Sequence, residues 1–222
     1  MGRERTLKKL HVFDLDRTLL VGNCSFAFFK FLSKMGFFSF RQKISAVAGK
    51  LKLKFFINTP KELHEKLFKK LFRGRFTAEI TDKVPSFLEE FLKKSLRKSL
   101  FKSLQQALER KETVLLLSNS PSFLVSAIAK QLGIIYWRAT EYAEDCKKCF
   151  DKIPYMMDGE TKALFLTAFA KEKGFLREEI FAYSDSIDDL PLLEQAGHKI
   201  AVAPDKRLRY LAKNRGWSIL ET

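Results

Sequence analysis

The chain has 222 residues, a hydrophobic fraction of 46% and a formal net charge of +15 at pH 7. This length allows one sizeable domain with an insertion or two small domains, and the apolar fraction supports a buried core rather than a disordered chain. Three cysteines leave at least one unpaired, and neither a signal peptide nor an apolar run of ~18 residues is evident, so we expect a cytoplasmic protein that is soluble or at most bound to a membrane surface.

The first predicted strand, His11–Phe13, runs directly into two carboxylates, Asp14 and Asp16. A buried strand ends in this way when its carboxyl end opens onto a polar site, and in parallel α/β sheets ligands bind at that edge. Two acids separated by one residue can share a divalent cation, and one can attack a substrate while the other transfers a proton. Asp14 and Asp16 are therefore the first candidate catalytic residues.

Residues 21–110 differ in charge from the rest of the chain, with 20 Lys and Arg against 7 Asp and Glu, whereas the remainder has 21 against 19. Their apolar residues recur at helical spacing, and no stretch has a convincing strand pattern. Thr59 and Pro60 form a typical helix start, and the pattern of Phe87–Leu108 predicts one helix that returns the chain to the sheet. We expect three or four helices here. The predicted domains are a Rossmann-like core of residues 1–20 and 97–222 and a helical cap of residues 21–96.

After this insertion, strands alternate with helices along the chain. The predicted strands are Val114–Leu117, Ile180–Tyr183 and Lys199–Val202. The predicted helices are Pro121–Leu132, Lys162–Glu172 and Asp189–Ala196, and residues 137–155 are expected to be irregular with a small hairpin. This alternation predicts an α/β fold with a doubly wound, mainly parallel sheet and an inserted all-helical cap.

Four motifs lie at the predicted strand ends or at the start of a helix. They are Asp14–Thr18, Val114–Pro121, Asp158–Lys162 and Tyr183–Leu193. In this order they resemble the motifs of the haloacid-dehalogenase-like phosphohydrolases, and more narrowly of the phosphoserine-phosphatase-like branch, which has a helical cap after the first strand. The resemblance covers nearly the whole chain, and its specificity comes from the combination rather than from any single motif.

The resemblance implies a phosphatase that forms an aspartyl-phosphate. Asp14 would be the nucleophile, and Asp16 the acid that protonates the leaving oxygen and later the base that activates water. Carboxylates do form covalent phosphoryl intermediates, and a general acid must lie within hydrogen-bonding reach of the leaving group. Arg17 stands where the family usually has a small residue, so it either contacts the substrate or points into solvent.

The same resemblance implies a set of phosphate-binding side chains. They are Thr18, Ser118, Asn119 and Lys162. Taken alone, the second motif favours a simpler explanation, in which Ser118 or Ser120 only caps the helix that starts at Pro121, because serine commonly caps helices. A lone lysine at the start of a helix is usually solvated, but in this family the lysine in this motif neutralises the phosphoryl group and the nucleophile.

The metal ligands that the resemblance implies are the carboxylates of Asp14 and Asp185 and the main-chain carbonyl of Asp16. Asp188 and Asp189 would lie in the outer shell of the metal, although both are also suited to charge the start of the next helix. Because all of these ligands are oxygen atoms, they favour Mg²⁺ over zinc. The predicted cofactor is therefore Mg²⁺.

Three functions remain open at this point. The first is hydrolysis of a small soluble phosphomonoester, with phosphoserine as one candidate. The second is a peripheral membrane phosphatase of a phospholipid precursor such as phosphatidylglycerophosphate, because a surface rich in Phe and Lys suits anionic lipid. The third, a basic module that binds nucleic acid, leaves the acidic motifs without a role and has no recognised nucleic-acid motif. The remaining polar candidates are interpreted as structural or reduced loop residues: Cys146, Cys149, His11, His64 and His198.

Overall fold

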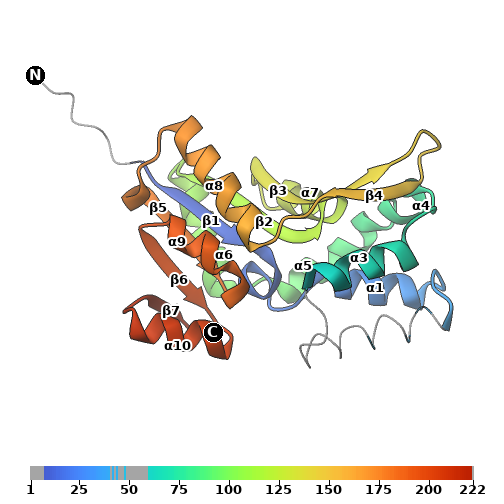
Figure 1. Ribbon diagram of the computed structural model, residues 1–222, viewed down its shortest axis with the longest axis horizontal. Helices are drawn as coiled ribbons and strands as arrows, with labels where there is room; N and C mark the ends of the chain where they lie inside the picture. Colours follow the sequence, from blue (N-terminus) through green and yellow to red (C-terminus); the bar gives the residue numbers. More distant parts are fainter. Residues whose placement is uncertain (1–7, 41, 43, 45–47, 49–59, 222) are drawn as a thin grey trace, which may run out of the picture.

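The structure is a computed structural model that describes residues 8–40, 42, 44, 48 and 60–221. Its centre is a seven-stranded sheet with the strand order β4-β3-β2-β1-β5-β6-β7 (Figure 1). Neighbouring strands pair in parallel except β3 and β4, which are antiparallel. The strands are β1 (Leu10–Asp14), β2 (Thr113–Pro121), β3 (Tyr136–Glu144), β4 (Phe150–Tyr155), β5 (Ile180–Ser184), β6 (His198–Val202) and β7 (Ser218–Leu220).

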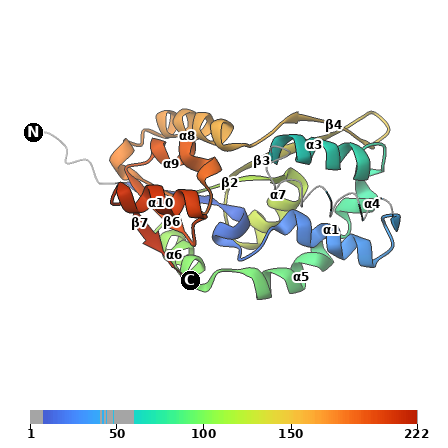
Figure 2. The same ribbon diagram turned by 60° about the horizontal axis from the view of Figure 1, so that its bottom comes forward.

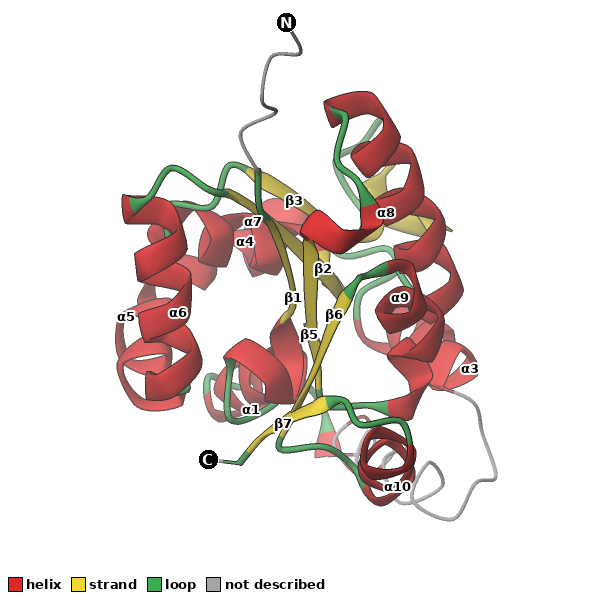
Figure 3. Cartoon of the chain, turned by 90° about the vertical axis from the view of Figure 1, so that its left-hand side faces the viewer, coloured by secondary structure: helices red, strands yellow, loops and turns green. Residues whose placement is uncertain are grey.

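Helices cover both faces of this sheet, which Figure 3 shows nearly edge-on. The described α-helices are α1 (Cys24–Lys34), α3 (Pro60–Leu71), α4 (Thr77–Thr81), α5 (Val84–Ser95), α6 (Lys98–Glu109), α7 (Ser122–Gln131), α8 (Gly159–Lys173), α9 (Leu190–Gln195) and α10 (Lys206–Asn214). Helices α6 and α7 pack on one face, and α8, α9 and α10 pack on the other. Short helical turns η1 (Leu15–Leu19), η2 (Arg177–Glu179) and η3 (Ile187–Asp189) follow or precede strands.

Strand β1 shows why its apolar run needs two covered faces. Val12 and Phe13 are both fully buried, and they belong to two separate hydrophobic clusters on opposite faces of the sheet. Successive side chains of a strand alternate between faces, so a continuous apolar run fits a strand with helices on both sides. The doubly wound α/β fold is confirmed, and the four predicted strands correspond to β1, β2, β5 and β6.

The prediction of one helix over Phe87–Leu108 is wrong. The chain leaves the helical conformation at Leu96 and Arg97, where ψ is 129° and 106°, so that α5 and α6 are separate helices. Leu96 pairs there with Leu20 as an isolated antiparallel bridge. Neither Gly nor Pro marks the break in the sequence, and contacts with a distant segment override the local helical preference.

Residues 137–155 are more regular than predicted. They include β3 except for its first residue, and all of β4, and form a hairpin that extends from the sheet alongside α3 and α4 (Figure 2). Main-chain hydrogen bonds join it to the segment between these helices, with Gly74 N donating to the Phe150 carbonyl at 2.7 Å and Thr77 N to the Lys148 carbonyl at 2.9 Å. Strand β7 and helix α10 have no counterpart in the prediction. Strand β7 has only three residues, which is too short to show a periodic pattern.

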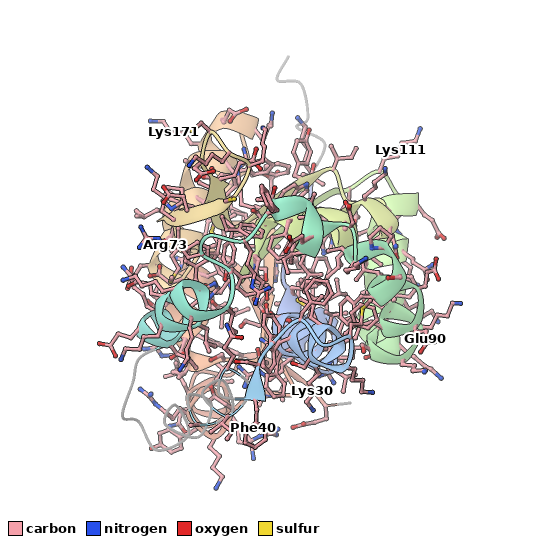
Figure 4. All side chains as sticks on the ribbon, turned by 90° about the vertical axis from the view of Figure 1, so that its right-hand side faces the viewer. Lys30, Phe40, Arg73, Glu90, Lys111 and Lys171 are labelled. Atoms are coloured by element: carbon pink, nitrogen blue, oxygen red, sulfur yellow. The ribbon has the colours of Figure 1, made fainter. Side chains whose placement is uncertain are left out.

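The segment after η1 buries some of its aromatic residues and exposes others. Phe28 and Phe29 of α1 belong to the core, whereas Phe40 is 77% exposed. Figure 4 shows Lys30, Phe40 and Arg73 at the surface of this part of the molecule. Phe55, Phe56 and the nearby lysines 43, 50, 52 and 54 lie outside the described residues. No helix in the described part of the chain is both long enough and apolar enough to cross a membrane.

Candidate active site

The carboxyl ends of β1, β2 and β5 lie side by side and bring the separate sequence motifs together. Asp14, the last residue of β1, is opposite Leu117 of β2, and Ser118 follows directly. On the other side of β1, Phe13 is opposite Tyr183 of β5. The second and fourth motifs therefore flank Asp14, as expected for a site at the carboxyl edge of a parallel sheet.

Lys162 reaches this edge from the first turn of α8 and joins two carboxylates. Its Nζ donates to Asp14 Oδ1 at 2.6 Å and to the two carboxylate oxygens of Asp189 at 2.9 and 3.0 Å. Asp189 also accepts a hydrogen bond from the Ser184 hydroxyl at 2.7 Å. All four side chains are buried, and only 4% of the Lys162 side chain is exposed. The lysine is therefore part of a buried charge network rather than a solvated helix residue.

The N-terminus of α8 is held directly against the loop that carries the acidic motif. The Asp158 side chain caps the helix. A Cβ atom added to Gly159 would lie 1.9 Å from the main-chain oxygen of Asp188, which is far closer than atoms can approach. Glycine therefore permits the contact between helix and loop that places Lys162 among the carboxylates.

Burial and mutual repulsion shift the pKa values of these groups. Burial raises the pKa of Asp14 to about 7, and Lys162 opposes this shift while Asp189 and Asp185 add to it. Burial likewise raises the pKa of Asp185 to about 6, against the attraction of Arg17. On Lys162 burial lowers the pKa, but Asp14 and Asp189 outweigh that effect and the net change is upward. The site concentrates negative charge, which favours the binding of a cation.

The carboxylate of Asp16 is held by donors from two other elements. Its Oδ1 accepts a hydrogen bond from the main-chain nitrogen of Cys24, the first residue of α1, at 2.6 Å. Its Oδ2 accepts one from the Ser120 hydroxyl at 2.5 Å, and Ser120 also lies 2.5 Å from the Ser25 hydroxyl. These hydrogen bonds fix the orientation of the Asp16 carboxylate.

Ser120 is a site residue that the motifs do not predict. A serine after a strand and before a helix is equally well explained as a cap, so its type and position carry no specific signal. In the structure it does not cap α7, because the residue before this helix, Pro121, makes no side-chain capping bond. The signal in the sequence is weak: Ser118 and Ser120 bracket Asn119 immediately after an apolar run.

Replacing Ser120 with Ala is expected to lower kcat about 10-fold with little change in KM, because Asp16 loses one of the two donors that orient it. The measurement is steady-state hydrolysis of p-nitrophenyl phosphate. Ser126→Ala is the matched control, since the Ser126 hydroxyl donates only to the Phe123 carbonyl of its own helix. Equal kcat values for the two variants and the wild type would contradict a role for Ser120.

Thr18 lies behind Asp185 rather than in the open part of the site. Its hydroxyl donates to Asp185 Oδ1 at 3.2 Å and accepts from the Asp185 main-chain nitrogen at 3.0 Å, and the residue is completely buried. The Thr18 hydroxyl thus orients Asp185, and phosphate binding by Thr18 stays a prediction. Arg17 has a left-handed backbone, with φ of 63°, and its Nε lies 3.5 Å from Asp185 Oδ2 while 65% of the side chain is exposed.

Of the other predicted site residues, Ser118 and Asn119 are hydrogen-bonded near the end of β2, whereas Asp188 is exposed. The buried Ser118 hydroxyl accepts a hydrogen bond from the main-chain nitrogen of Ser120 at 3.1 Å, which shapes the turn after β2. The Asn119 side-chain oxygen accepts from the Thr140 hydroxyl at 2.9 Å. The Asp188 side chain is exposed and, within the described part of the chain, makes no hydrogen bond or ion pair with the carboxylate cluster, so its expected place in an outer metal shell is not supported. It contributes its main-chain oxygen to the contact with α8 instead.

The donor set at this edge fits a hard divalent cation. Among the described residues there is no group of three or more His, Cys, Asp or Glu side chains arranged to hold a metal ion. Mg²⁺ does not need such a cage, because it is commonly held by one or two carboxylates together with waters and substrate phosphate oxygens. Asp14 and Asp185 provide two such carboxylates, and the acid-rich balance of charge described above supports the fit.

A basic cavity of about 420 Å³ lies elsewhere, at the amino-terminal edge of the sheet. It is lined by residues at the starts of β2 and β3 and at the end of α8, among them Thr113, Tyr136 and Lys173. None of the residues that line it belongs to the carboxylate site.

Comparison with known proteins identifies the family. The family model for haloacid dehalogenase-like hydrolases matches residues 11–194. The chain belongs to the haloacid dehalogenase-like hydrolase family. The matched range includes all four motifs, from β1 to α9. The phosphatases of this family generally use Mg²⁺.

Curated relatives from bacteria match about half of the chain. A protein of Mycobacterium tuberculosis named Probable phosphatase Rv3661 is 38% identical over 107 residues, which are 48% of this chain and 37% of the relative. Phosphoserine phosphatase SerB1 of the same organism is 34% identical over 114 residues, which are 50% of this chain and 37% of the relative. The matched segment thus spans well under half the length of these relatives.

Solved structures share the fold over nearly the full chain. A protein of unknown function from Bordetella pertussis superimposes with a TM-score of 0.84 and 22% identity, covering 97% of this chain and 99% of the other. A substrate-bound phosphoserine phosphatase superimposes with a TM-score of 0.70 and 17% identity, covering 99% and 95%. At these identities the likeness shows a common fold.

Proposed function

We propose that the protein is a Mg²⁺-dependent phosphatase that cleaves a phosphomonoester through an aspartyl-phosphate on Asp14. The observation that carries the proposal is the buried contact between Asp14 and Lys162, with Asp16 and Asp185 beside it at the carboxyl edge of the sheet. Membership of the hydrolase family and the relatives named as phosphatases support it. The division into a core of residues 1–20 and 97–222 and a cap of residues 21–96 is part of the same proposal.

The proposal gives each side chain a role. A carboxylate oxygen of Asp14, held by the contact between Lys162 and Oδ1, attacks phosphorus while the bond from phosphorus to the leaving oxygen breaks. Protonated Asp16 gives its proton to that leaving oxygen, and the alcohol departs. Asp16 then takes a proton from a water molecule, which attacks the phosphorus of the intermediate. Inorganic phosphate leaves, and the Asp14 carboxylate is restored.

Charge on the phosphoryl group must be balanced throughout this sequence. Lys162 supplies a fixed positive charge at the nucleophile, and we propose that Ser118 and Asn119 supply polar contacts from the end of β2. Asp185, oriented by Thr18, would hold the cation together with Asp14 and the Asp16 carbonyl. When bound, Mg²⁺ reduces the repulsion between the phosphate dianion and the attacking carboxylate.

The proposed substrate is a small phosphorylated metabolite. Relatives of the chain are named phosphoserine phosphatase and histidinol-phosphatase, the latter from Neisseria meningitidis, and phosphoserine is therefore the first compound to test. The decisive experiment is phosphate release from a panel of phosphorylated metabolites, with lysophospholipid phosphates included, in Mg²⁺ and in EDTA. Release of phosphate that requires Mg²⁺ supports the proposal, and its absence across the panel and with p-nitrophenyl phosphate contradicts it.

Mg²⁺ is expected to stabilise the folded protein more at pH 8 than at pH 5. Asp14 and Asp185 have folded pKa values of about 7 and about 6, raised from 3.8, so the folded state retains protons that the unfolded chain has lost. Without metal, their contribution to stability therefore falls as pH rises from about 4 to about 7 and then levels off. Above pH 7 the carboxylates are free for the cation, which adds about 2.7 kcal/mol at 100 times its Kd.

Thermal unfolding in EDTA and in Mg²⁺ at the two pH values measures this effect. Asp185→Asn should abolish most of the Mg²⁺-dependent rise in Tm, whereas the matched variant Asp188→Asn should retain it, because Asp188 is exposed and outside the cluster. A Mg²⁺ effect that is equal at both pH values would contradict the assignment of these carboxylates as ligands.

A further inference from the structure

The two chain segments that join the proposed cap to the sheet are paired with each other. Val21 N donates to the Ser95 carbonyl at 2.7 Å, and Arg97 N donates to the Leu19 carbonyl at 2.9 Å. Leu20 and Leu96, between these bonds, form an isolated antiparallel bridge. The outgoing and returning segments therefore form one short two-stranded connection directly after the η1 turn.

Arg97 extends from this connection into the η1 turn. Its Nε donates to the Thr18 carbonyl at 2.8 Å, and its Nη2 donates to the Arg17 carbonyl at 2.8 Å. The residue is 8% exposed, which is unusual for arginine in a chain with so many solvated basic residues. One guanidinium group thus holds two successive peptide groups of the turn that carries Asp16.

These two carbonyls belong to a backbone that cannot stabilise itself as a regular helix. Within η1, Asp16 (φ −75°, ψ 126°) and Arg17 (φ 63°, ψ −6°) are non-helical, and a positive φ is uncommon for a residue other than glycine. Hydrogen bonds from a charged donor are stronger than those between neutral groups, and a buried carbonyl left without a partner is costly. Arg97 therefore supplies the contacts that favour this strained arrangement.

The position of the turn sets the position of the proposed catalytic groups. Thr18, whose carbonyl Arg97 holds, orients Asp185 through its hydroxyl, and the Asp16 carboxylate is fixed to Ser120 only if its backbone stays in place. We propose that Arg97 is a positioning residue for the η1 turn, which links the connection to the cap with the geometry of Asp16 and Asp185. This proposal rests on the proposed phosphatase function.

The test compares Arg97→Met and Arg97→Lys with the wild type by hydrogen exchange and by kinetics. In Arg97→Met, amide exchange in a peptide covering residues 15–20 should accelerate about 10-fold, including the Leu20 amide, which donates to the Leu15 carbonyl at 2.9 Å. kcat for p-nitrophenyl phosphate should fall about 100-fold with KM changed much less, because the groups are misplaced rather than removed. Arg97→Lys, which offers one nitrogen donor in place of the two-pronged guanidinium group, should recover part of the slow amide exchange and part of kcat.

Arg75→Met is the matched control, because Arg75 Nη2 donates to the Phe37 carbonyl at 3.0 Å and makes no contact with η1. It should leave exchange in residues 15–20 and kcat unchanged. Wild-type exchange in this peptide in both Arg97 variants would overturn the proposal, even if kcat falls. Exchange is measured without substrate, so it tests the role of Arg97 even if the wild type has no phosphatase activity. An inactive wild type would contradict the proposed function alone. If Arg97→Met fails to fold, exchange in Arg97→Lys decides the role of Arg97.

Discussion

Replacing Asp14 with Asn is expected to abolish hydrolysis and to leave the protein at least as stable as the wild type. The proposed nucleophile is lost, so kcat should fall about 10⁴-fold or more. Stability should not fall, because burial and the neighbouring acids raise the pKa of Asp14 to about 7, so that its buried charge is unfavourable at neutral pH, and because Lys162 keeps Asp189 as a partner. A neutral amide of the same shape removes that charge. Substitutions at functional sites often increase stability in this way while they abolish activity.

Two measurements check this expectation: phosphate release in Mg²⁺ and thermal unfolding at pH 7 without metal. Asp188→Asn is the matched control, because it makes the same substitution at an exposed acid a short distance from the cluster. It should keep both activity and Tm near the wild-type values. Substantial turnover by Asp14→Asn would exclude Asp14 as the nucleophile, and a large fall in its Tm would show that the carboxylate is mainly structural.

Replacing Lys162 with Met is expected to remove both activity and stability. The substitution leaves Asp14 and Asp189 buried without the cation that bridges them at 2.6 and 2.9 Å. Breaking a buried ion pair by removing one partner typically costs about 3–5 kcal/mol. Activity should fall about 10³-fold, because the positive charge beside the phosphoryl group is lost.

Denaturant unfolding of single and double variants separates the two effects. Adding Asp14→Asn to Lys162→Met should recover part of the lost stability, since one uncompensated carboxylate disappears, but no activity. Lys171→Met, on the same helix but exposed, should behave as the wild type in both respects. If Lys162→Met unfolds with the wild-type free energy, the buried network does not have the energetic role assigned to it.

Features of the fold and of the candidate site were predictable where a local sequence pattern agrees with a requirement of the tertiary structure. The apolar run of β1 ends in Asp14 because the strand is buried on both faces and opens at one edge, and this requirement is visible in the sequence. Lys162 and Asp185 were predictable only as parts of an ordered set of motifs. The pairing geometry then places them at the same edge.

Other features were not predictable, because their signal is three-dimensional. Arg97 lies in a run of helix-forming residues among many lysines, where an arginine is usually solvated, and only the returning chain shows that it is buried. Ser120 has the residue type of a helix cap and bonds to Asp16 instead. Thr18 is the last residue of the first motif, and nothing in the sequence indicates that its hydroxyl bonds to Asp185. In each case the partner is distant in sequence.

The proposed mechanism requires a covalent bond between a carboxylate oxygen of Asp14 and phosphorus, and trapping that bond tests it most directly. The enzyme is mixed with a substrate that it hydrolyses, and the reaction is quenched within milliseconds. Reduction with borohydride then converts an aspartyl-phosphate into homoserine. Peptide mass spectrometry then locates the change. We predict homoserine at position 14 in the wild type and none in Asp14→Asn. Steady release of phosphate with an unmodified Asp14, or with homoserine at another aspartate, would contradict the mechanism.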